Sequence, residues 1–411
     1  MHSEKPDSRS TKLPAVVLTL SLLSALLLIA ARPAQAQTYS VLYSFTGTPD
    51  GANPYAGLAL DKKGNLYGTT FAGGVDNRGT VFKIPTSGGE TVLYSFKGIS
   101  GVSAGDAANP HAGVTLDMQG NLYGTTWGGG NRLNDGTVFK LDAAGNETLL
   151  FLFNGAPGDG GDPSGLVLDS EGNLYGTTQK GGDNNGQEDG TVFKLDQSGV
   201  ETILHTFRTG RLDGTIPRGG VVFDSEGNLY GVTTTGGSVQ PNGTGGLGTV
   251  FKLVAADADA EEQLASFTGT PTGAKPYAGV VLDTQGNIYG TTYEGGTYGF
   301  GTVFKLDTAG NLTALYSFGS ISNDGKYPEA SAVLDSEGNL YGTTTKGGTY
   351  GDGTVFEINT VGNETVLHSF GATKDGKTPY GPLVFDTHGN LYGTTYGGGV
   401  KGHGTVFKLT P

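Results

Sequence analysis

The chain has 411 residues, a formal net charge of −14 and no cysteine. The lack of cysteine excludes disulfides, thiolate metal sites and a cysteine nucleophile, so stability must come from packing alone. The acidic balance, without any cluster of Lys and Arg, excludes nucleic-acid binding, which needs clustered cations against the phosphates.

Residues 1–36 predict a signal peptide. Basic side chains precede an uncharged stretch, 13–31, and an Ala-x-Ala site that ends at Ala36 follows it. We expect cleavage after Ala36 and an exported protein that is periplasmic, on the cell surface or secreted. The alternative is an uncleaved anchor, because the uncharged stretch approaches the roughly 20 residues that span a bilayer.

The rest of the chain, 37–411, is one tandem repeat. The phrase Gly-Asn-Leu-Tyr-Gly-Thr-Thr occurs seven times, with Val232 for one Thr and Ile288 for one Leu, and begins at Gly64, Gly120, Gly172, Gly227, Gly286, Gly338 and Gly389. The phrase Gly-Thr-Val-Phe also occurs seven times, beginning at Gly79, Gly136, Gly190, Gly248, Gly301, Gly353 and Gly404. A period of 51–59 residues is typical of propeller blades or long solenoid repeats.

Each repeat predicts four short strands, and in the first full copy these cover 56–61, 65–70, 80–84 and 91–96. The first run is apolar without alternation, which indicates a strand buried on both faces at the centre of a ring, and apolarity declines toward the fourth run. The connection between the first two runs, Asp-x-x-Gly-Asn, predicts a tight hairpin with a bulge. No stretch has the length and period of a helix.

The two ends of the repeat array complement each other. The array opens with a lone fourth run, 39–45, and ends on a third run, 405–409. Pairing between them would complete a last sheet and close a ring, whereas an open solenoid would need polar capping repeats. We therefore predict an all-β fold, a monomeric seven-bladed β-propeller with four antiparallel strands per blade, as a single domain over 37–411.

The phrases Tyr-Gly-Thr-Thr-x-x-Gly-Gly and Gly-Thr-Val-Phe-Lys-Leu-Asp resemble the GloVer tandem repeat over about 39–409. That family is described as choice-of-anchor, and no shared biochemical activity is established for it. The resemblance implies extracellular or surface display in a bacterium. Thr410 and Pro411 follow the last strand directly, so we expect release or retention through an uncleaved N-terminus. The Asp-x-x-Gly-Asn-Leu-Tyr run is also similar to NHL and gluconolactonase-type propellers, which supports fold more than activity.

Candidate ligand-binding residues lie where the loops between strands surround the channel. The residue after the proline that opens the first strand varies between copies: Tyr55, His111, Ser164, Arg218, Tyr277, Glu329 and Tyr380. The residue after the second strand's last Thr also varies: Phe71, Trp127, Gln179, Thr234, Tyr293, Thr345 and Tyr396. Aromatic faces with hydrogen-bonding neighbours would stack on sugar rings or grip a peptide, which predicts a glycan or protein ligand. The alternative is that these rings only fill gaps between blades.

Two other functions stay open. A propeller enzyme of lactonase, lyase or glycan-active type would place its site over the channel and use Glu329, His111 or Arg218. A purely structural surface protein would have no site there. Converging carboxylates and histidine in the channel would favour the enzyme, and an aromatic rim without them would favour binding.

No cofactor is expected. The Asp-Gly pairs before the first strand favour turns, and calcium remains a weak alternative at Asp159 and Asp162, because calcium needs six to eight converging oxygens. The histidines fall in different repeat positions, and we expect His205 and His368 on the surface of outer strands.

Overall fold

The computed structural model describes residue 2 and residues 38–98, 105–131, 133–155, 159–182, 189–208, 213–238, 246–255 and 257–410. The expected signal peptide, 1–36, lies outside the described residues apart from residue 2. Thr38–Pro411 forms one compact unit. Within the described part of the chain, no helix is long and apolar enough to span a membrane.

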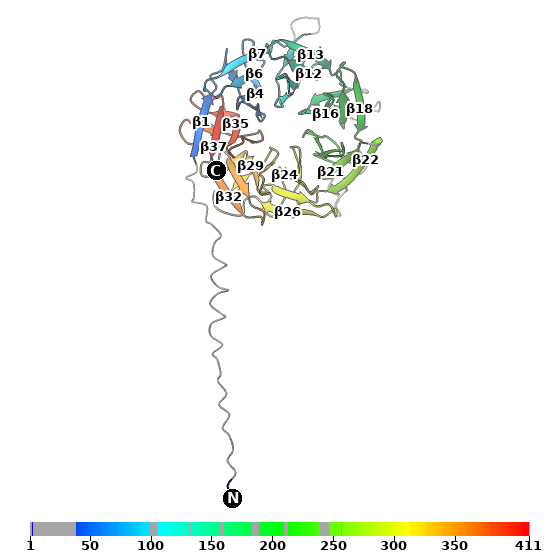
Figure 1. Ribbon diagram of the computed structural model, residues 1–411, viewed down its shortest axis with the longest axis vertical. Coiled ribbons are helices and arrows are strands. Elements are labelled where there is room, and N and C mark those ends of the chain that lie inside the picture. The colour runs from blue at the N-terminus through cyan, green and yellow to red at the C-terminus, as the bar shows by residue number, and fades with distance from the viewer. Residues whose placement is uncertain are drawn as a thin grey trace. The chain divides into compact units, whose positions relative to one another are not determined.

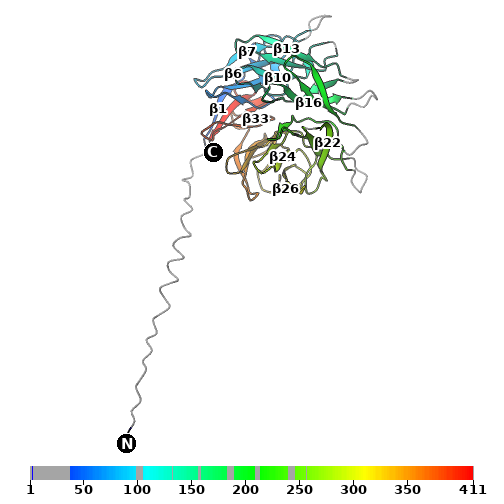
Figure 2. The same ribbon diagram turned by 45° about the vertical axis from the view of Figure 1, so that its right-hand side comes forward.

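Seven antiparallel sheets, each with four principal strands, stand around a common centre (Figures 1 and 2). This arrangement confirms the predicted seven-bladed β-propeller. We call the four strands A to D from the centre outward and number the blades 1 to 7 by their A strands. The described residues form strands and turns but no helix.

The strand bounds repeat closely from blade to blade. The A strands are β3 (Ala59–Leu60), β9 (Thr115–Leu116), β15 (Val167–Leu168), β19 (Val222–Phe223), β23 (Val281–Leu282), β28 (Val333–Leu334) and β34 (Val384–Phe385). The B strands are β4 (Leu66–Thr70), β10 (Leu122–Thr126), β16 (Leu174–Gly181), β20 (Leu229–Thr233), β24 (Ile288–Thr292), β29 (Leu340–Thr344) and β35 (Leu391–Thr395). The C strands are β6 (Thr80–Ile84), β12 (Thr137–Leu141), β17 (Thr191–Leu195), β21 (Thr249–Val254), β25 (Thr302–Leu306), β31 (Thr354–Ile358) and β37 (Thr405–Thr410). The D strands are β7 (Thr91–Ser95), β13 (Glu147–Leu152), β18 (Glu201–Thr206), β22 (Asp257–Ser266), β26 (Leu312–Ser317), β32 (Glu364–Ser369) and β1 (Thr38–Ser44).

The A strands differ from the sequence prediction. Only two residues of each run pair with strand B, and these residues are half-buried rather than covered on both faces. Burial is greatest in strands B and C, so the prediction that strand A is buried on both faces is wrong. The reason is position: B and C lie between two strands and between neighbouring blades, whereas A borders the open centre of the ring.

Short two-stranded ribbons that the sequence did not predict join the loops around the centre. Each pairs the two residues that follow the loop aspartate with two residues of the glycine-containing segment that follows strand B. They are β2 (Gly51–Ala52) with β5 (Ala72–Gly73), β8 (Ala107–Ala108) with β11 (Gly128–Gly129), β27 (Gly325–Lys326) with β30 (Lys346–Gly347), and β33 (Gly376–Lys377) with β36 (Gly397–Gly398). In blade 3, β14 (Gly160–Pro163) pairs with an extension of β16 in the same way.

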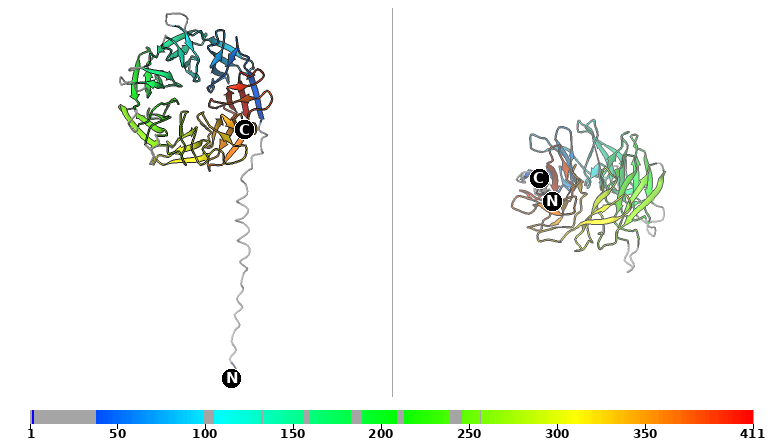
Figure 3. Two further views of the ribbon diagram at one scale, coloured as in Figure 1. Left: turned by 180° about the vertical axis from the view of Figure 1, so that it is seen from behind. Right: turned by 60° about the horizontal axis from the view of Figure 1, so that its bottom comes forward.

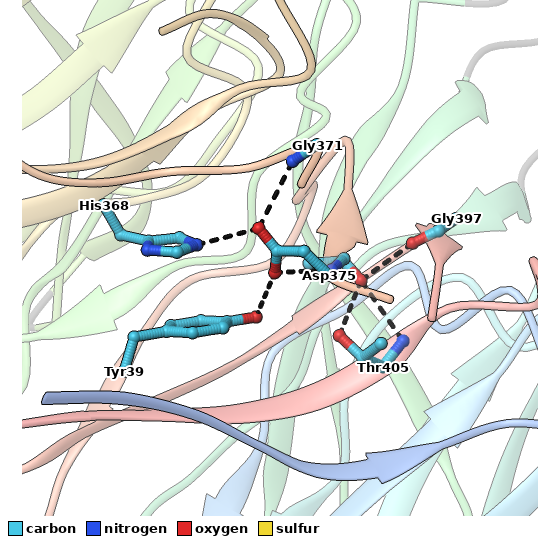
Figure 4. Close-up of polar contacts among 8 residues, drawn as sticks. Tyr39, His368, Gly371, Asp375, Gly397 and Thr405 are labelled. Atoms are coloured by element: carbon cyan, nitrogen blue, oxygen red, sulfur yellow. Dashed lines mark hydrogen bonds and ion pairs between the residues drawn. The ribbon is translucent and has the colours of Figure 1, made fainter. Parts of the chain in front are cut away.

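The first strand closes the ring, as predicted. Strand β1 pairs antiparallel with β37 from Thr38 opposite Thr410 to Ser44 opposite Thr405, and Figures 1 and 3 show the blue first strand beside the red last one. The Tyr39 hydroxyl then donates a hydrogen bond of 2.6 Å to Asp375 in the loop between blades 6 and 7 (Figure 4). The chain's head therefore bonds both to the blade that it completes and to the loop before that blade.

Pairs of phenylalanines hold neighbouring blades together. The phenylalanine that follows each D strand is fully buried and meets, edge to face, the phenylalanine of the next blade's C strand at 5.0–5.3 Å. The seven pairs are Phe45 with Phe82, Phe96 with Phe139, Phe153 with Phe193, Phe207 with Phe251, Phe267 with Phe304, Phe318 with Phe356, and Phe370 with Phe407. Edge-to-face contact adds to the area that these rings bury.

The repeat phrase Tyr-Gly-Thr-Thr follows from this packing. A Cβ added at Gly68 would lie 2.6 Å from Phe82 Cζ, so only glycine leaves room for the ring. Thr69 donates a hydrogen bond to the Ala112 carbonyl of the next blade at 2.9 Å, and Thr70 shares one with Thr80 at 2.8 Å. The glycine therefore makes room for the ring, the first threonine bonds to the next blade, and the second bonds within its own blade.

The Asp-x-x-Gly-Asn hairpin is also as predicted. In blade 3 the Asp169 carboxylate accepts hydrogen bonds from the N–H groups of Glu171 and Asn173, from the Asn173 amide and from the Tyr175 hydroxyl. Gly172 has a φ of 87°, which favours glycine. These hydrogen bonds hold the pKa of Asp169 below its ordinary value, although burial acts in the other direction.

Candidate ligand-binding site at the centre of the ring

A cavity of about 340 Å³ lies at the centre of the ring and is lined by residues from every blade. Its lining includes all seven residues that follow the proline before strand A: Tyr55, His111, Ser164, Arg218, Tyr277, Glu329 and Tyr380. Each blade thus contributes one of these side chains to the cavity, and three of the seven are tyrosines. The volume is within the range of sites for small molecules.

An unusual backbone conformation sets the position of these side chains. The residue before each proline has a left-handed φ of 51–58°, and these residues are Asn53, Asn109, Asp162, Ile216, Lys275, Tyr327 and Thr378. Such a φ is uncommon outside glycine, and for β-branched Ile216 and Thr378 it is a strained conformation. The N–H group of the strained residue donates to a carbonyl of the preceding blade, as Asn53 does to His403 at 2.8 Å. The neighbouring blade therefore holds each cavity residue in place.

One side of the cavity is a continuous stack of rings. Trp127 lies on His111 with ring centroids 3.5 Å apart, His111 lies against Tyr55 at 3.8 Å, and Tyr55 stacks on Tyr380 at 4.5 Å. His111 and Tyr55 thus have both faces covered by other rings. They can offer only their edges and polar atoms to a ligand, which differs from the expected rim of free aromatic faces.

A second stack stands on blades 4 to 6. The Arg218 guanidinium lies 4.6 Å from the centroid of Tyr277, which stacks on Tyr293 at 4.9 Å. Tyr293 then meets Tyr327 at 5.0 Å. Tyr327 is the left-handed residue before the proline, and the sequence did not single it out because the residues at that position share no chemical property.

The charged groups of the cavity are strongly affected by burial. Burial raises the pKa of Glu329 to about 7, against the opposing effects of Arg218 and the Tyr55 hydroxyl. Burial, with the positive charge of Arg218, lowers the pKa of His111 to about 3, so its imidazole is neutral at physiological pH. Among the lining residues, all of which the structure describes, Glu329 is the one carboxyl group.

Trp127 lies at the end of the first stack and carries a polar N–H group. Its indole Nε1 is buried and has no hydrogen-bond partner among the described residues. A buried N–H without a partner is uncommon in folded proteins and calls for an explanation, such as a bound molecule. Ser164 differs, because its hydroxyl already donates to the Arg218 carbonyl at 2.7 Å.

The second set of candidate residues divides into two groups. Trp127 and Gln179 line the cavity, whereas Phe71, Tyr293 and Tyr396 do not. Phe71 meets the edge of His111 at 6.4 Å, and Tyr396 meets the edge of Tyr380 at 5.5 Å. Thr345, at the same repeat position, bonds to the Tyr327 carbonyl instead. Phe71, Tyr293 and Tyr396 therefore support lining residues from behind.

The two aspartates considered for calcium have separate partners. Asp159 accepts hydrogen bonds from the N–H groups of Asn154 and Gly160 and from the Asn154 amide. Asp162 forms an ion pair with Lys180 at 2.8 Å.

The expected surface placement of two histidines is wrong. The side chains of His205 and His368 are only 13% and 18% exposed, and each bonds to an aspartate in the loop after its strand, Asp213 and Asp375 respectively. Tyrosine makes this bond in other blades, as Tyr94 does to Asp106. The alternation along strand D predicted an exposed side chain, but the loop that follows the strand places an aspartate against this position.

Comparisons with known proteins agree with this architecture. The sequence matches the Gloeobacter/Verrucomicrobia repeat over residues 102–244 and 237–411, which is well over half of the chain. No curated protein matches it.

Solved structures with the same fold are distant in sequence. The extracellular domain of BT4673 from B. thetaiotaomicron, described as a one-component system, has a TM-score of 0.54 and 11% identity, over 90% of this chain and 39% of that one. PorZ, a bacterial surface component of the type-IX secretion system of Porphyromonas gingivalis, has a TM-score of 0.52 and 15% identity, over 89% of this chain and 47% of that one. The gluconolactonase XC5397 from Xanthomonas campestris has a TM-score of 0.45 and 16% identity, over 91% of this chain and 89% of that one.

The likenesses to the BT4673 domain and to PorZ support the fold and not an activity, because the identities are low. The chain spans less than half the length of the BT4673 domain and of PorZ.

Proposed function

Because the chain belongs to the Gloeobacter/Verrucomicrobia repeat family, we propose that it is an exported, non-catalytic propeller that binds a ligand in its central cavity. The proposed ligand is the end of a glycan chain, with a protein loop as the alternative. Export is supported by the signal-peptide pattern of residues 1–36 and by the fold's likeness to an extracellular domain and to a bacterial surface component.

The observation that carries this proposal is the unpartnered indole N–H of Trp127 inside a cavity built from all seven blades. Trp127 ends a stack whose other inner members, His111 and Tyr55, are covered on both faces. A ligand that places an apolar ring face on the indole and an oxygen near Nε1 would complete both interactions. A pyranose ring has both features.

The remaining lining favours a ligand rich in hydroxyl groups. Arg218 donates only, Gln179 donates and accepts, and Glu329 can do either because its pKa is near 7. Tyr55 contributes its ring edge rather than a free face, because His111 and Tyr380 cover it. Hydrogen bonding around one aromatic contact gives orientation and specificity in such cavities.

The test is a glycan-array screen of the purified protein, followed by thermal shift with each glycan that binds. A ligand of the folded state raises the melting temperature. Trp127→Leu should abolish binding, and Phe71→Leu, at the equivalent position outside the cavity, should bind as the wild type does. Binding that is unchanged by Trp127→Leu, or that is lost equally in both variants, would contradict the proposal.

A catalytic alternative has one observation in its favour. Glu329 is a buried carboxyl group with a pKa of about 7 in a cavity, which suits a general acid or base of a lactonase or lyase, with Arg218 stabilising an anion. NMR of the bound glycan would separate the two functions. Turnover that Glu329→Gln removes while binding persists would establish the enzyme, and an unchanged glycan supports the binding module.

A further inference from the structure

The outer side of the ring repeats a three-residue contact at the junctions between blades. A D-strand side chain of one blade faces an aspartate in the following loop, and a glutamate from the next blade's D strand comes close to that aspartate. At the junction of blades 1 and 2 these residues are Tyr94, Asp106 and Glu147, and the tyrosine donates to the aspartate at 2.9 Å. Here the tyrosine is a hydrogen-bond donor and has no role as a metal ligand.

The junction of blades 3 and 4 has a different chemistry. His205 of β18 replaces the tyrosine, while Asp213 and Glu261 of β22 keep the two carboxylates. One ligand atom from each of the three side chains lies within 4.8 Å of the other two. Within the described residues, no other three His, Asp or Glu side chains come together in this way.

The Asp213 carboxylate, like that of Asp324, also lacks a bond that four other counterparts have. The Oδ1 atoms of Asp50, Asp106, Asp159 and Asp375 each accept the N–H group of the next residue at 2.6–2.8 Å. Asp213 Oδ1 is buried without a partner, and the Asp213 side chain is only 9% exposed.

The backbone accounts for the missing bond at Asp213, whereas at Asp324 the next residue, Gly325, has no positive φ. Gly214, the next residue, has a φ of 87°, whereas Gly51 and Gly160 at the same position do not have a positive φ. The turn at Gly214 takes its N–H group away from the carboxylate. Glu261 Oε1 is likewise buried without a partner, as are the equivalent oxygens of Glu90, Glu147, Glu201 and Glu364. What distinguishes this junction is the imidazole of His205 beside the two carboxylates. Buried carboxylate oxygens without a partner are costly unless a cation or a proton neutralises them.

The distances favour a small tetrahedral ion. His205 Nε2 and Asp213 Oδ2 are 3.3 Å apart, which is about the separation of two ligands bound to Zn²⁺ at roughly 2.0–2.2 Å. Calcium binds six to eight oxygens and does not suit an imidazole ligand. One imidazole and two carboxylates are a ligand set for zinc and similar ions, with a fourth position left for water.

We propose that His205, Asp213 and Glu261 bind a Zn²⁺-type divalent ion that links blade 3 to blade 4. His205 and Asp213 come from blade 3 and the loop after it, and Glu261 comes from blade 4. The ion would act as a cross-blade tie on the outer side of the ring, away from the central cavity. It is independent of the proposed ligand-binding function.

The junction of blades 6 and 7 is a natural control. His368 and Asp375 repeat the pair of histidine and aspartate at 3.0 Å, but Tyr39 occupies the place of the glutamate (Figure 4). Tyr39 donates to Asp375 Oδ1 at 2.6 Å, and Gly376 N–H donates to the same atom. This carboxylate is fully bonded and has no second carboxylate beside it, so we expect no metal there.

The experiment is calorimetric titration of Zn²⁺ into the metal-free purified protein, with thermal shift in parallel. Wild-type protein should bind one equivalent and melt at a higher temperature with zinc than with EDTA. His205→Tyr, which installs the residue of other junctions, and Glu261→Gln should each weaken binding by about 100-fold or more. His368→Tyr, the matched control, should bind as the wild type does.

Circular dichroism of the metal-free variants checks that each one folds. The proposal is overturned if the wild-type protein binds no zinc, or if His205→Tyr and Glu261→Gln both bind it unchanged. Loss of binding in His368→Tyr instead would place the ion elsewhere and would also overturn the proposal.

Discussion

Replacing Phe45 by alanine tests whether the chain's first strand closes the ring. Phe45 follows β1, is fully buried, and packs edge to face on Phe82 of blade 1 at 5.1 Å. Phe153 has the same surroundings in the middle of the chain, where it is fully buried and 5.3 Å from Phe193. In a closed ring the two positions are equivalent, although one lies near the chain terminus.

Removing either ring leaves a cavity between two blades. Each substitution should lower the free energy of unfolding by about 3–5 kcal/mol, the usual cost of Phe→Ala in a core. Urea unfolding, followed by the fluorescence of the single tryptophan and by circular dichroism, measures both. The two probes must give one coincident transition before the free energies are compared.

The closed ring predicts that the two costs agree within about 1 kcal/mol, since equivalent cavities form. In an open arrangement Phe45 would lie at a free edge, and its loss would cost about 0.5 kcal/mol or less, as at exposed sites. A wild-type urea midpoint for Phe45→Ala, together with a large shift for Phe153→Ala, would refute the closure.

Two further predictions concern pH and packing. Burial, with a neighbouring aspartate, raises the pKa of Glu201 to about 8 and the pKa of Glu90, Glu147 and Glu364 to about 7. The folded state favours the protonated glutamates, so this stability is complete below the unfolded pKa of about 4.3 and is lost as pH rises through 7 to 8. The melting temperature in EDTA should therefore fall between about pH 5 and about pH 8. Glu201→Gln should reduce the accompanying loss of unfolding free energy by about 1 kcal/mol after solvent screening; a flat or rising profile would contradict the shifts. In blade 4, an added Cβ at Gly231 would lie 2.5 Å from Phe251 Cζ, so Gly231→Ala should cost about 1–3 kcal/mol in urea unfolding. Phe251→Leu should recover part of this loss, and no recovery would mean that the ring is not the cause.

The blade architecture could be predicted because the same contacts are needed in every copy. The Phe82 ring fills the space that a side chain at Gly68 would need, and Thr70 and Thr80 share one hydrogen bond. Both pairs therefore recur in every blade. Closure could be predicted because the N-terminal run, 39–45, has no partner of its own and the last repeat lacks a fourth strand. Seven repetitions of one constraint leave little ambiguity.

The seven positions of the central cavity were also predictable. Each follows a proline that repeats, while its own identity changes, as from Tyr55 to His111. What these side chains do to one another was not predictable, because their stacking depends on the left-handed residue before each proline. Ile216 and Thr378 are poor left-handed residues by type, so nothing in their chemistry marks the turn.

The contacts between blades left a signal that a position-by-position comparison of the copies could have found. Where Thr272 replaces the loop aspartate, Leu312 replaces the glutamate of the next blade, and where Tyr39 replaces the glutamate, it bonds to Asp375. The two positions change together because the side chains face each other across the junction. His205 looked like a surface residue when its strand was considered alone, since the covering loop belongs to another part of the repeat.

Trp127 provides the most direct test of a ligand-binding cavity, because it is the single tryptophan of the chain and stands at the end of the cavity's ring stack. Its fluorescence should change in a saturable way as a glycan that the protein binds is titrated, with the same affinity that calorimetry gives. Saturable binding of that glycan with no change in the emission of Trp127 would place the ligand elsewhere and contradict the account.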